Sequence, residues 1–113
     1  MLTLPIKKKW FDMIKSGEKK EEYREIKPYY TSRFTRQLPT LDYEIIGTGL
    51  KSKTLLSTFP VIFRNGYSKN SPSIKCYVRL EVDYGIKEWG AEPNKLYYVL
   101  KIQSVEVISK CWR

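Results

Sequence analysis

Hydrophobic and polar residues alternate along the second half of the chain. Between residues 73 and 84 apolar side chains fall at every second position, with charged residues and Tyr77 between them. A period of two places the two sets on opposite faces of a strand, so this segment is predicted to be a long strand with one buried face. A second long strand, or two joined at a bend, is predicted over residues 96–108.

The first quarter of the chain has a helical pattern between two shorter strands. A strand over residues 2–4 is expected to end at Pro5, and apolar residues then recur at helical spacing up to Ser16. The helix should run over about residues 8–16, with Gly17 in the left-handed conformation that follows many helices. A strand over residues 20–26 comes next.

The middle of the chain has strong turn signals. A strand over residues 61–64 precedes Asn65-Gly66, a dipeptide typical of tight turns, and a polar, basic loop follows. Residues 27–36 interleave bases with aromatics, which suits either base stacking or a helical turn packed by its rings. Residues 41–54 have no decisive pattern. Several strands with one early helix indicate an α+β fold, in one domain spanning residues 1–113.

Composition narrows the class of protein. Hydrophobic residues make up 42% of the chain and aromatics 14%, which is typical of a folded domain rather than a disordered tail. No apolar run approaches the roughly 18 residues of a membrane span. The first residues do not resemble a signal peptide, because lysines interrupt the apolar region that it would need. We therefore expect a cytoplasmic protein.

The residue types that are missing exclude several chemistries. The chain has no histidine, which removes serine–histidine and cysteine–histidine catalytic arrangements. Cys76 and Cys111 are far apart in sequence, so a zinc site is not expected and both should be small buried hydrophobes. No metal or other cofactor is predicted.

The net charge of +9 is concentrated in two blocks. Residues 1–36 carry ten Lys or Arg against five acids, and residues 51–80 carry six against none. If the two blocks meet in the fold, they form a positive face suited to a partner that bears phosphate. The alternative is a diffuse positive surface that only aids solubility.

Three charged residues are expected to converge after the helix. Alternation along the strand puts Glu22 and Arg24 on one face, and the turn at Gly17 brings Lys19 beside them. The two cations should keep Glu22 ionised, and Arg24 should lower the pKa of Lys19. A lysine tuned in this way can act as a base, whereas the alternative is an ion-pair network that fixes the strand.

These residues have the spacing Gly-x-Lys-x-x-Glu-x-Arg, formed by Gly17, Lys19, Glu22 and Arg24. This spacing resembles the signature of ASCH domains, which are small PUA-like barrels. Residues 63–67 and 88–91 look like a bacterial and phage branch of that family. The resemblance implies a PUA-like mixed β-barrel with a helix at its mouth.

The leading hypothesis is an RNA-binding or modified-nucleotide-binding domain with a basic cleft. In this interpretation Lys19, Glu22 and Arg24 form the floor of the cleft. Phosphate would be contacted by Lys8, Lys9, Arg64 and Lys69. A base would stack on Tyr67, and its edge would be contacted by Asn65 or Asn70.

Two alternatives stay open. The first is a small hydrolase on the same scaffold, either a ribonuclease or an amidohydrolase acting on acylated nucleosides. One ASCH-like group resembles such amidohydrolases and uses the motif lysine with a threonine at the position of Glu22, so this chain departs from that pattern. Lys19, Glu22 and Arg24 would then be catalytic. The second is a protein-interaction module with a basic surface.

Overall fold

The chain folds as an α+β domain built on one curled sheet. The computed structural model describes residues 1–37 and 58–108, so the ambiguous stretch at residues 41–54 lies outside the described part. The elements are β1 (Leu2–Ile6), α1 (Lys8–Ser16), β2 (Glu21–Arg24), α2 (Pro28–Gln37), β3 (Thr58–Asn65), β4 (Ser73–Tyr84), the short 3-10 helix η1 (Lys87–Trp89) and β5 (Leu96–Ile108).

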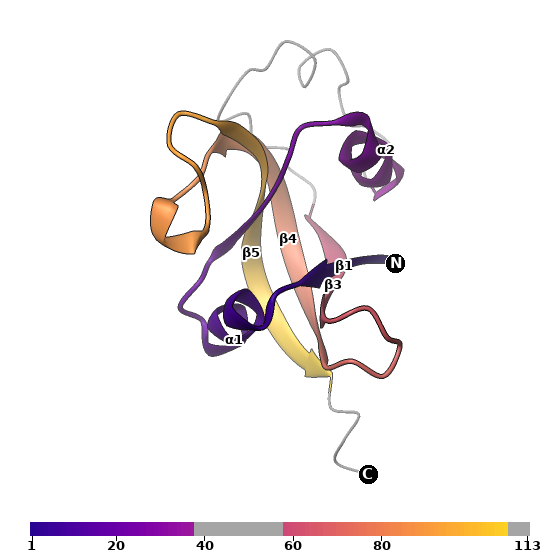
Figure 1. Cartoon of the computed structure of the whole chain (residues 1–113). Coiled ribbons are helices and arrows are strands. Elements are labelled where there is room, and N and C mark those ends of the chain that lie inside the picture. Colours follow the sequence, from indigo (N-terminus) through magenta and orange to yellow (C-terminus); the bar gives the residue numbers. More distant parts are fainter. Residues whose placement is uncertain (38–57, 109–113) are drawn as a thin grey trace.

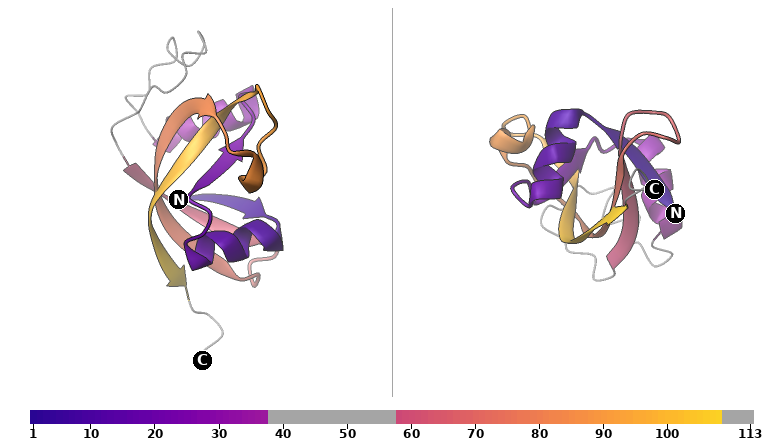
Figure 2. Two further views of the ribbon diagram at one scale, coloured as in Figure 1. Left: turned by 90° about the vertical axis from the view of Figure 1, so that its left-hand side faces the viewer. Right: turned by 90° about the horizontal axis from the view of Figure 1, so that it is seen from below.

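The five strands form a single mixed sheet in the order β1-β3-β4-β5-β2. β1 runs parallel to β3, and the other neighbouring pairs are antiparallel. The register between β4 and β5 shifts at Tyr77 and Val78, and such irregularities increase the local twist of a sheet. The sheet curls into a half-barrel, with α1 at its open side (Figures 1 and 2). A barrel-like fold is therefore confirmed.

The main core lies on the face of the sheet that both helices cover. Phe11 and Ile14 of α1 and Phe34 of α2 are buried there. They join the alternating apolar residues of β4, which confirms the predicted buried face: Ile74, Cys76, Val78, Leu80 and Val82. Cys76 is fully buried, as expected for a small hydrophobe, whereas Cys111 lies outside the described residues.

Pro5 does not end the first strand, contrary to expectation. β1 continues through Pro5 to Ile6, and Pro5 is paired with Arg64 in β3. Proline has no N–H to donate, but it is tolerated in an edge strand, and β1 is the edge of the sheet. The two basic blocks of the sequence meet along this parallel pair of strands.

The predicted end of the first helix is confirmed. Gly17 has φ of 88° and its N–H donates to the carbonyl oxygen of Ile14. The amide of Lys19 then donates to the carbonyl of Met13 at 2.9 Å, so the chain turns back tightly against α1. This turn sets the position of Lys19 relative to β2.

The basic and aromatic segment that begins at Lys27 forms α2. Phe34 is fully buried and its ring lies 5.0 Å from that of Tyr98 and 6.4 Å from that of Phe59, measured between centroids. Tyr29 stays 53% exposed. The segment therefore packs as a helix, and only part of its aromatic surface remains accessible.

Tyr23 belongs to a second, smaller cluster rather than to the main core. It packs against Ala91, Tyr97 and Val99, on the other face of β5. Its hydroxyl donates to Glu21 and accepts the amide N–H of Ile86, so the ring links β2 to the segment before η1.

Candidate functional site

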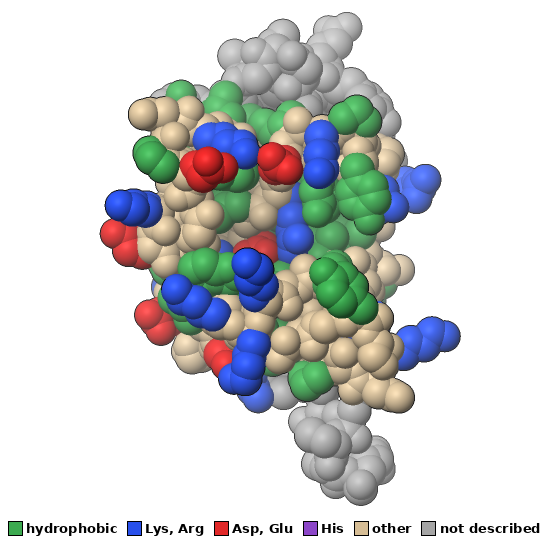
Figure 3. Space-filling model, in the orientation of Figure 1, with side chains coloured by type: hydrophobic (Ala, Val, Ile, Leu, Met, Phe, Trp, Pro, Cys, Tyr) green, Lys and Arg blue, Asp and Glu red, His purple; other side chains and the backbone are tan. Residues whose placement is uncertain are grey.

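A pocket of about 420 Å³ opens between α1, β1, β2 and the loop that follows β3. We call it the main pocket. Its place corresponds to the hollow near the middle of the face in Figure 3, where acidic and basic side chains are visible. Nine residues line it: Pro5, Ile6, Lys7, Trp10, Glu22, Arg24, Asn65, Gly66 and Tyr67. Both basic blocks of the sequence contribute to its lining.

Glu22 supplies the carboxylate of the main pocket. Its Oε1 lies 3.1 Å from Nζ of Lys19, and its Oε2 lies 2.9 Å from a terminal guanidinium nitrogen of Arg24. The side chain keeps 8% of its surface exposed, so the carboxylate is largely enclosed but still borders the pocket. The three charged residues converge as their spacing predicted.

Lys19 lies beneath the pocket rather than in it. The residue is 1% exposed, and its Nζ donates to the carbonyl oxygen of Trp89 at 2.7 Å. The same Nζ is 4.9 Å from the ring centroids of both Trp10 and Tyr23, which suits cation–π attraction. Lys19 is therefore enclosed by aromatic rings, a carbonyl and the carboxylate of Glu22.

Burial is the main influence on the pKa of Lys19. Loss of solvent lowers this pKa, the ion pair with Glu22 raises it in part, and the charge of Arg24 lowers it by a smaller amount. The predicted direction is confirmed, but the leading cause differs from the sequence interpretation, which attributed it to Arg24. The sequence indicated neither the depth of Lys19 nor the rings above it.

Trp10 forms the wall of the main pocket on the side of α1. Gly90, after η1, has φ of 102°, and a Cβ there would lie 3.0 Å from the ring of Trp10. A residue with a side chain would be strained at this φ and would press on the indole. Gly90 thus allows the ring to lie close to the backbone after η1.

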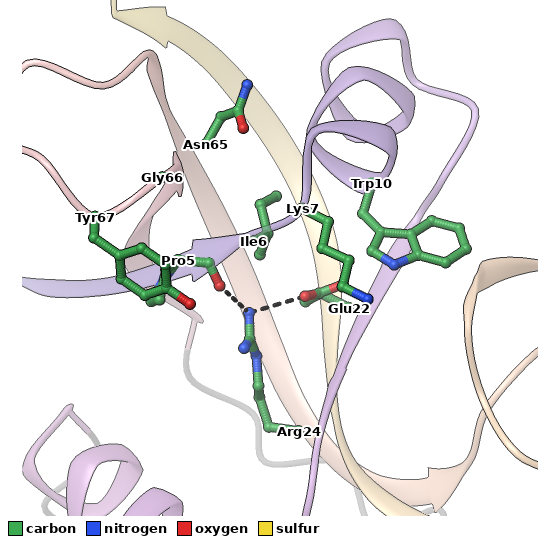
Figure 4. Close-up of a pocket in the computed structure, with 9 residues that line it drawn as sticks. All are labelled: Pro5, Ile6, Lys7, Trp10, Glu22, Arg24, Asn65, Gly66 and Tyr67. Atoms are coloured by element: carbon green, nitrogen blue, oxygen red, sulfur yellow. Dashed lines mark hydrogen bonds and ion pairs between the residues drawn. The ribbon is translucent and has the colours of Figure 1, made fainter.

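Arg24 connects the carboxylate to the edge strand. The guanidinium nitrogen that binds Glu22 also donates to the carbonyl oxygen of Pro5 at 3.0 Å (Figure 4). Its Nε is buried and has no hydrogen-bond partner among the described residues. The guanidinium carbon lies 5.8 Å from the ring centroid of Tyr30. Arg24 is therefore held in place from two sides.

The opposite wall comes from the loop between β3 and β4. The amide N–H of Asn65 donates to the carbonyl of Pro72 at 2.9 Å and closes the base of the loop. Tyr67 is 90% exposed, and its ring lies beside Pro5 at the rim of the pocket, with Trp10 on the far side (Figure 4). The loop therefore lies on the same side of the molecule as Lys19, Glu22 and Arg24, which we call the Glu22 cluster.

The lysines around the start of α1 differ in their position relative to the main pocket. Lys7 lines the main pocket and extends toward Glu22 (Figure 4), whereas Lys8 and Lys9 are absent from its lining. Lys8 pairs with Asp12 at 2.6 Å, and Nζ of Lys9 lies 4.6 Å from the ring centroid of Trp10. Lys7 directly precedes the two lysines that the sequence predicted as phosphate contacts.

The other predicted contacts divide into two groups. Asn65 and Tyr67 line the main pocket, and Arg64 lines a smaller hollow beside it. Lys69 and Asn70 are exposed at the outer part of the loop and line neither hollow. Sequence reasoning did not select Trp10 for the site, because its helical spacing indicated only a core position.

Comparison of the chain with family models, curated proteins and solved structures gave no match. In the described ranges, no three His, Cys, Asp or Glu side chains are grouped to hold a metal ion. None of the helices in these ranges combines the length and apolar character needed to span a bilayer.

Proposed function

We propose that the main pocket binds one nucleotide unit of RNA or of a modified nucleotide. The observation that carries this proposal is the carboxylate of Glu22 in a pocket with aromatic residues on two sides. Each carboxylate oxygen accepts one charged donor from Lys19 or Arg24 and retains a second lone pair. Such an acceptor suits the amino groups at the edge of a nucleobase.

The remaining lining supports the same ligand chemistry. Tyr67 offers an exposed ring against which a base can stack, Trp10 offers an aromatic wall, and Lys7 offers a cation for phosphate. Asn65 provides an amide that can both donate and accept at a base edge. In the described part of the chain, no other residue forms a hydrogen bond with the side chains of Lys7, Asn65 or Tyr67, which leaves them available to a ligand.

We also propose a PUA-like barrel of the ASCH type for this chain. The curled mixed sheet with a helix at its open side supports this assignment, as does the Gly-x-Lys-x-x-Glu-x-Arg spacing. Glu22 and Arg24 of this spacing line the main pocket, and Lys19 is paired with Glu22 beneath it, which fits a functional signature.

The hydrolase alternative has less support from the geometry. A base or nucleophile must reach the reacting atom, and Lys19 is enclosed beneath Trp10 with its Nζ bound to Trp89 and Glu22. The ring would have to move before Lys19 could contact a substrate. Turnover of RNA or of an acylated nucleoside by the wild-type protein would support the hydrolase over a binding domain.

Binding of a labelled single-stranded RNA, measured by fluorescence anisotropy over a salt series, tests the proposal. A ligand held partly through phosphate should bind less tightly as salt rises, with a slope of about −0.7 in log K against log salt for each phosphate contacted. Affinity that does not change with salt would contradict the phosphate contacts. Absence of binding to RNA and to nucleotides would overturn the proposed function.

A further inference from the structure

A second hollow of about 190 Å³ adjoins the main pocket, and we call it the side pocket. It is lined by Thr3, Pro5, Arg64, Gly66 and Tyr67. Three of these residues, Pro5, Gly66 and Tyr67, also line the main pocket. The two hollows therefore share a wall, and the exposed ring of Tyr67 belongs to both.

Arg64 gives the side pocket its charge. It lies in β3 opposite Pro5 of β1, and its Nε is buried without a hydrogen-bond partner in the described part of the chain. The lining contains no acidic residue. The guanidinium of Arg64 is the single charged group in this lining, and together with the polar Thr3 it suits an anionic oxygen rather than a neutral group.

The main pocket has a different chemistry. It contains the carboxylate of Glu22 and the indole of Trp10, which suit a base, whereas the side pocket has a guanidinium and a hydroxyl, which suit a phosphate. In a nucleic acid strand each base is followed by a phosphodiester and then by another nucleotide. The order of features along the protein surface, base site, tyrosine and phosphate site, matches that repeat.

We propose that the ligand is a single strand rather than a free nucleotide, with the phosphodiester next to the bound base held in the side pocket by Arg64. This inference rests on the proposed function of the main pocket. Tyr67 lies between the two positions, where its ring can stack on the bound base or on its neighbour.

Affinities for a labelled random-sequence RNA hexamer and for the four nucleoside 5′-monophosphates, measured by anisotropy and competition, test this inference. We expect the wild type to bind the hexamer at least about tenfold more tightly than any monophosphate, because a 5′-monophosphate lacks the 3′ phosphodiester that follows the bound base in a strand. We expect Arg64→Gln to weaken hexamer binding by about tenfold and to leave monophosphate affinity within about twofold. In the Arg64→Gln variant the magnitude of the salt slope for the hexamer should fall by about 0.7.

Two further variants make the result specific. Arg64→Lys retains the charge and should recover part of the loss, which a purely structural role of the guanidinium would not predict. Lys15→Gln removes one charge at the exposed end of α1, away from both pockets, and should leave the hexamer affinity within about twofold. Circular dichroism and thermal unfolding of each variant establish that the fold is kept.

The strand proposal and the proposed function fail differently. If monophosphates bind as tightly as the hexamer, or if Arg64→Gln weakens hexamer binding no more than Lys15→Gln, the strand proposal is overturned and the main pocket remains a nucleotide site. If Arg64→Gln weakens both ligands equally, the side pocket serves a single nucleotide and the strand proposal also fails. If the wild type binds neither ligand, both proposals are overturned.

Discussion

The ring of Trp10 covers the ammonium group of Lys19, with 4.9 Å between the ring centroid and Nζ. The ammonium group also donates to the carbonyl oxygen of Trp89 at 2.7 Å and lies 3.1 Å from the carboxylate of Glu22. Lys19 therefore neutralises Glu22 from below, while the carboxylate still borders the main pocket. The ion pair explains how an acidic group is kept at the base of the pocket that we propose for an anionic polymer.

Replacing Lys19 with methionine should destabilise the protein by about 3 kcal/mol. The variant leaves the carboxylate of Glu22 buried with Arg24 as its remaining partner and removes the donor to Trp89. Loss of one partner from a buried ion pair is strongly destabilising, because the other charge stays away from water. Urea unfolding followed by circular dichroism gives the change in the free energy of unfolding.

The double variant Lys19→Met/Glu22→Gln is the matched control. It removes both charges with little change in volume, so we expect part of the stability lost in the single variant to return. A single variant as stable as the wild type would contradict a structural role for the ion pair. It would instead favour a lysine that is kept for chemistry.

The convergence of the Glu22 cluster was predictable because local rules determine it. Alternation along a strand places Glu22 and Arg24 on one face, and Gly17 ends the helix where only a left-handed residue fits. The buried face of β4 follows from the same alternation. These features depend on residues close together in sequence.

Features that depend on packing between distant elements were not predictable. Pro5 continues a strand because β1 is the edge of the sheet, and the sequence does not give strand order. Which lysine of the run faces the pocket depends on how α1 is rotated against β1, which placed Lys7 there rather than Lys8 or Lys9. The enclosure of Lys19 likewise requires Trp89, seventy residues later in the chain.

Tyr67→Ala should weaken RNA binding by about tenfold without changing stability. Stacking of a base on an aromatic side chain contributes roughly 1–3 kcal/mol, and this ring is 90% exposed, so its removal opens no cavity. Anisotropy titration and thermal unfolding measure the two effects. Tyr84→Ala, at another exposed tyrosine that does not line the main pocket, should leave the affinity unchanged. Equal losses in both variants would indicate nonspecific adhesion to aromatic surface.

Lys7→Ala should weaken RNA binding more than Lys8→Ala. Lys7 lines the main pocket, whereas Lys8 forms an exposed ion pair with Asp12. We expect the Lys7 variant to lower the magnitude of the salt slope by about 0.7, the value for one phosphate on a single strand. Titrations at several salt concentrations supply both slopes. A larger effect at Lys8 would return the phosphate contact to the position that the sequence first suggested.

Stability should fall as the pH rises above 9, and Cys76 should account for part of the fall. Burial raises the pKa of Cys76 from 9.0 to about 12, so between these values the unfolded chain releases a proton that the folded protein keeps. At pH 10 this thiol therefore lowers the free energy of unfolding by about 1.4 kcal/mol. Burial also raises the pKa of Tyr23 and of Tyr98, which acts in the same direction at higher pH.

Urea unfolding of the wild type and of Cys76→Ala at pH 8 and pH 10 isolates the effect of the thiol, because the tyrosines are common to both proteins. The variant should lose less stability over this interval, and parallel losses would show that the Cys76 thiol does not carry the predicted shift.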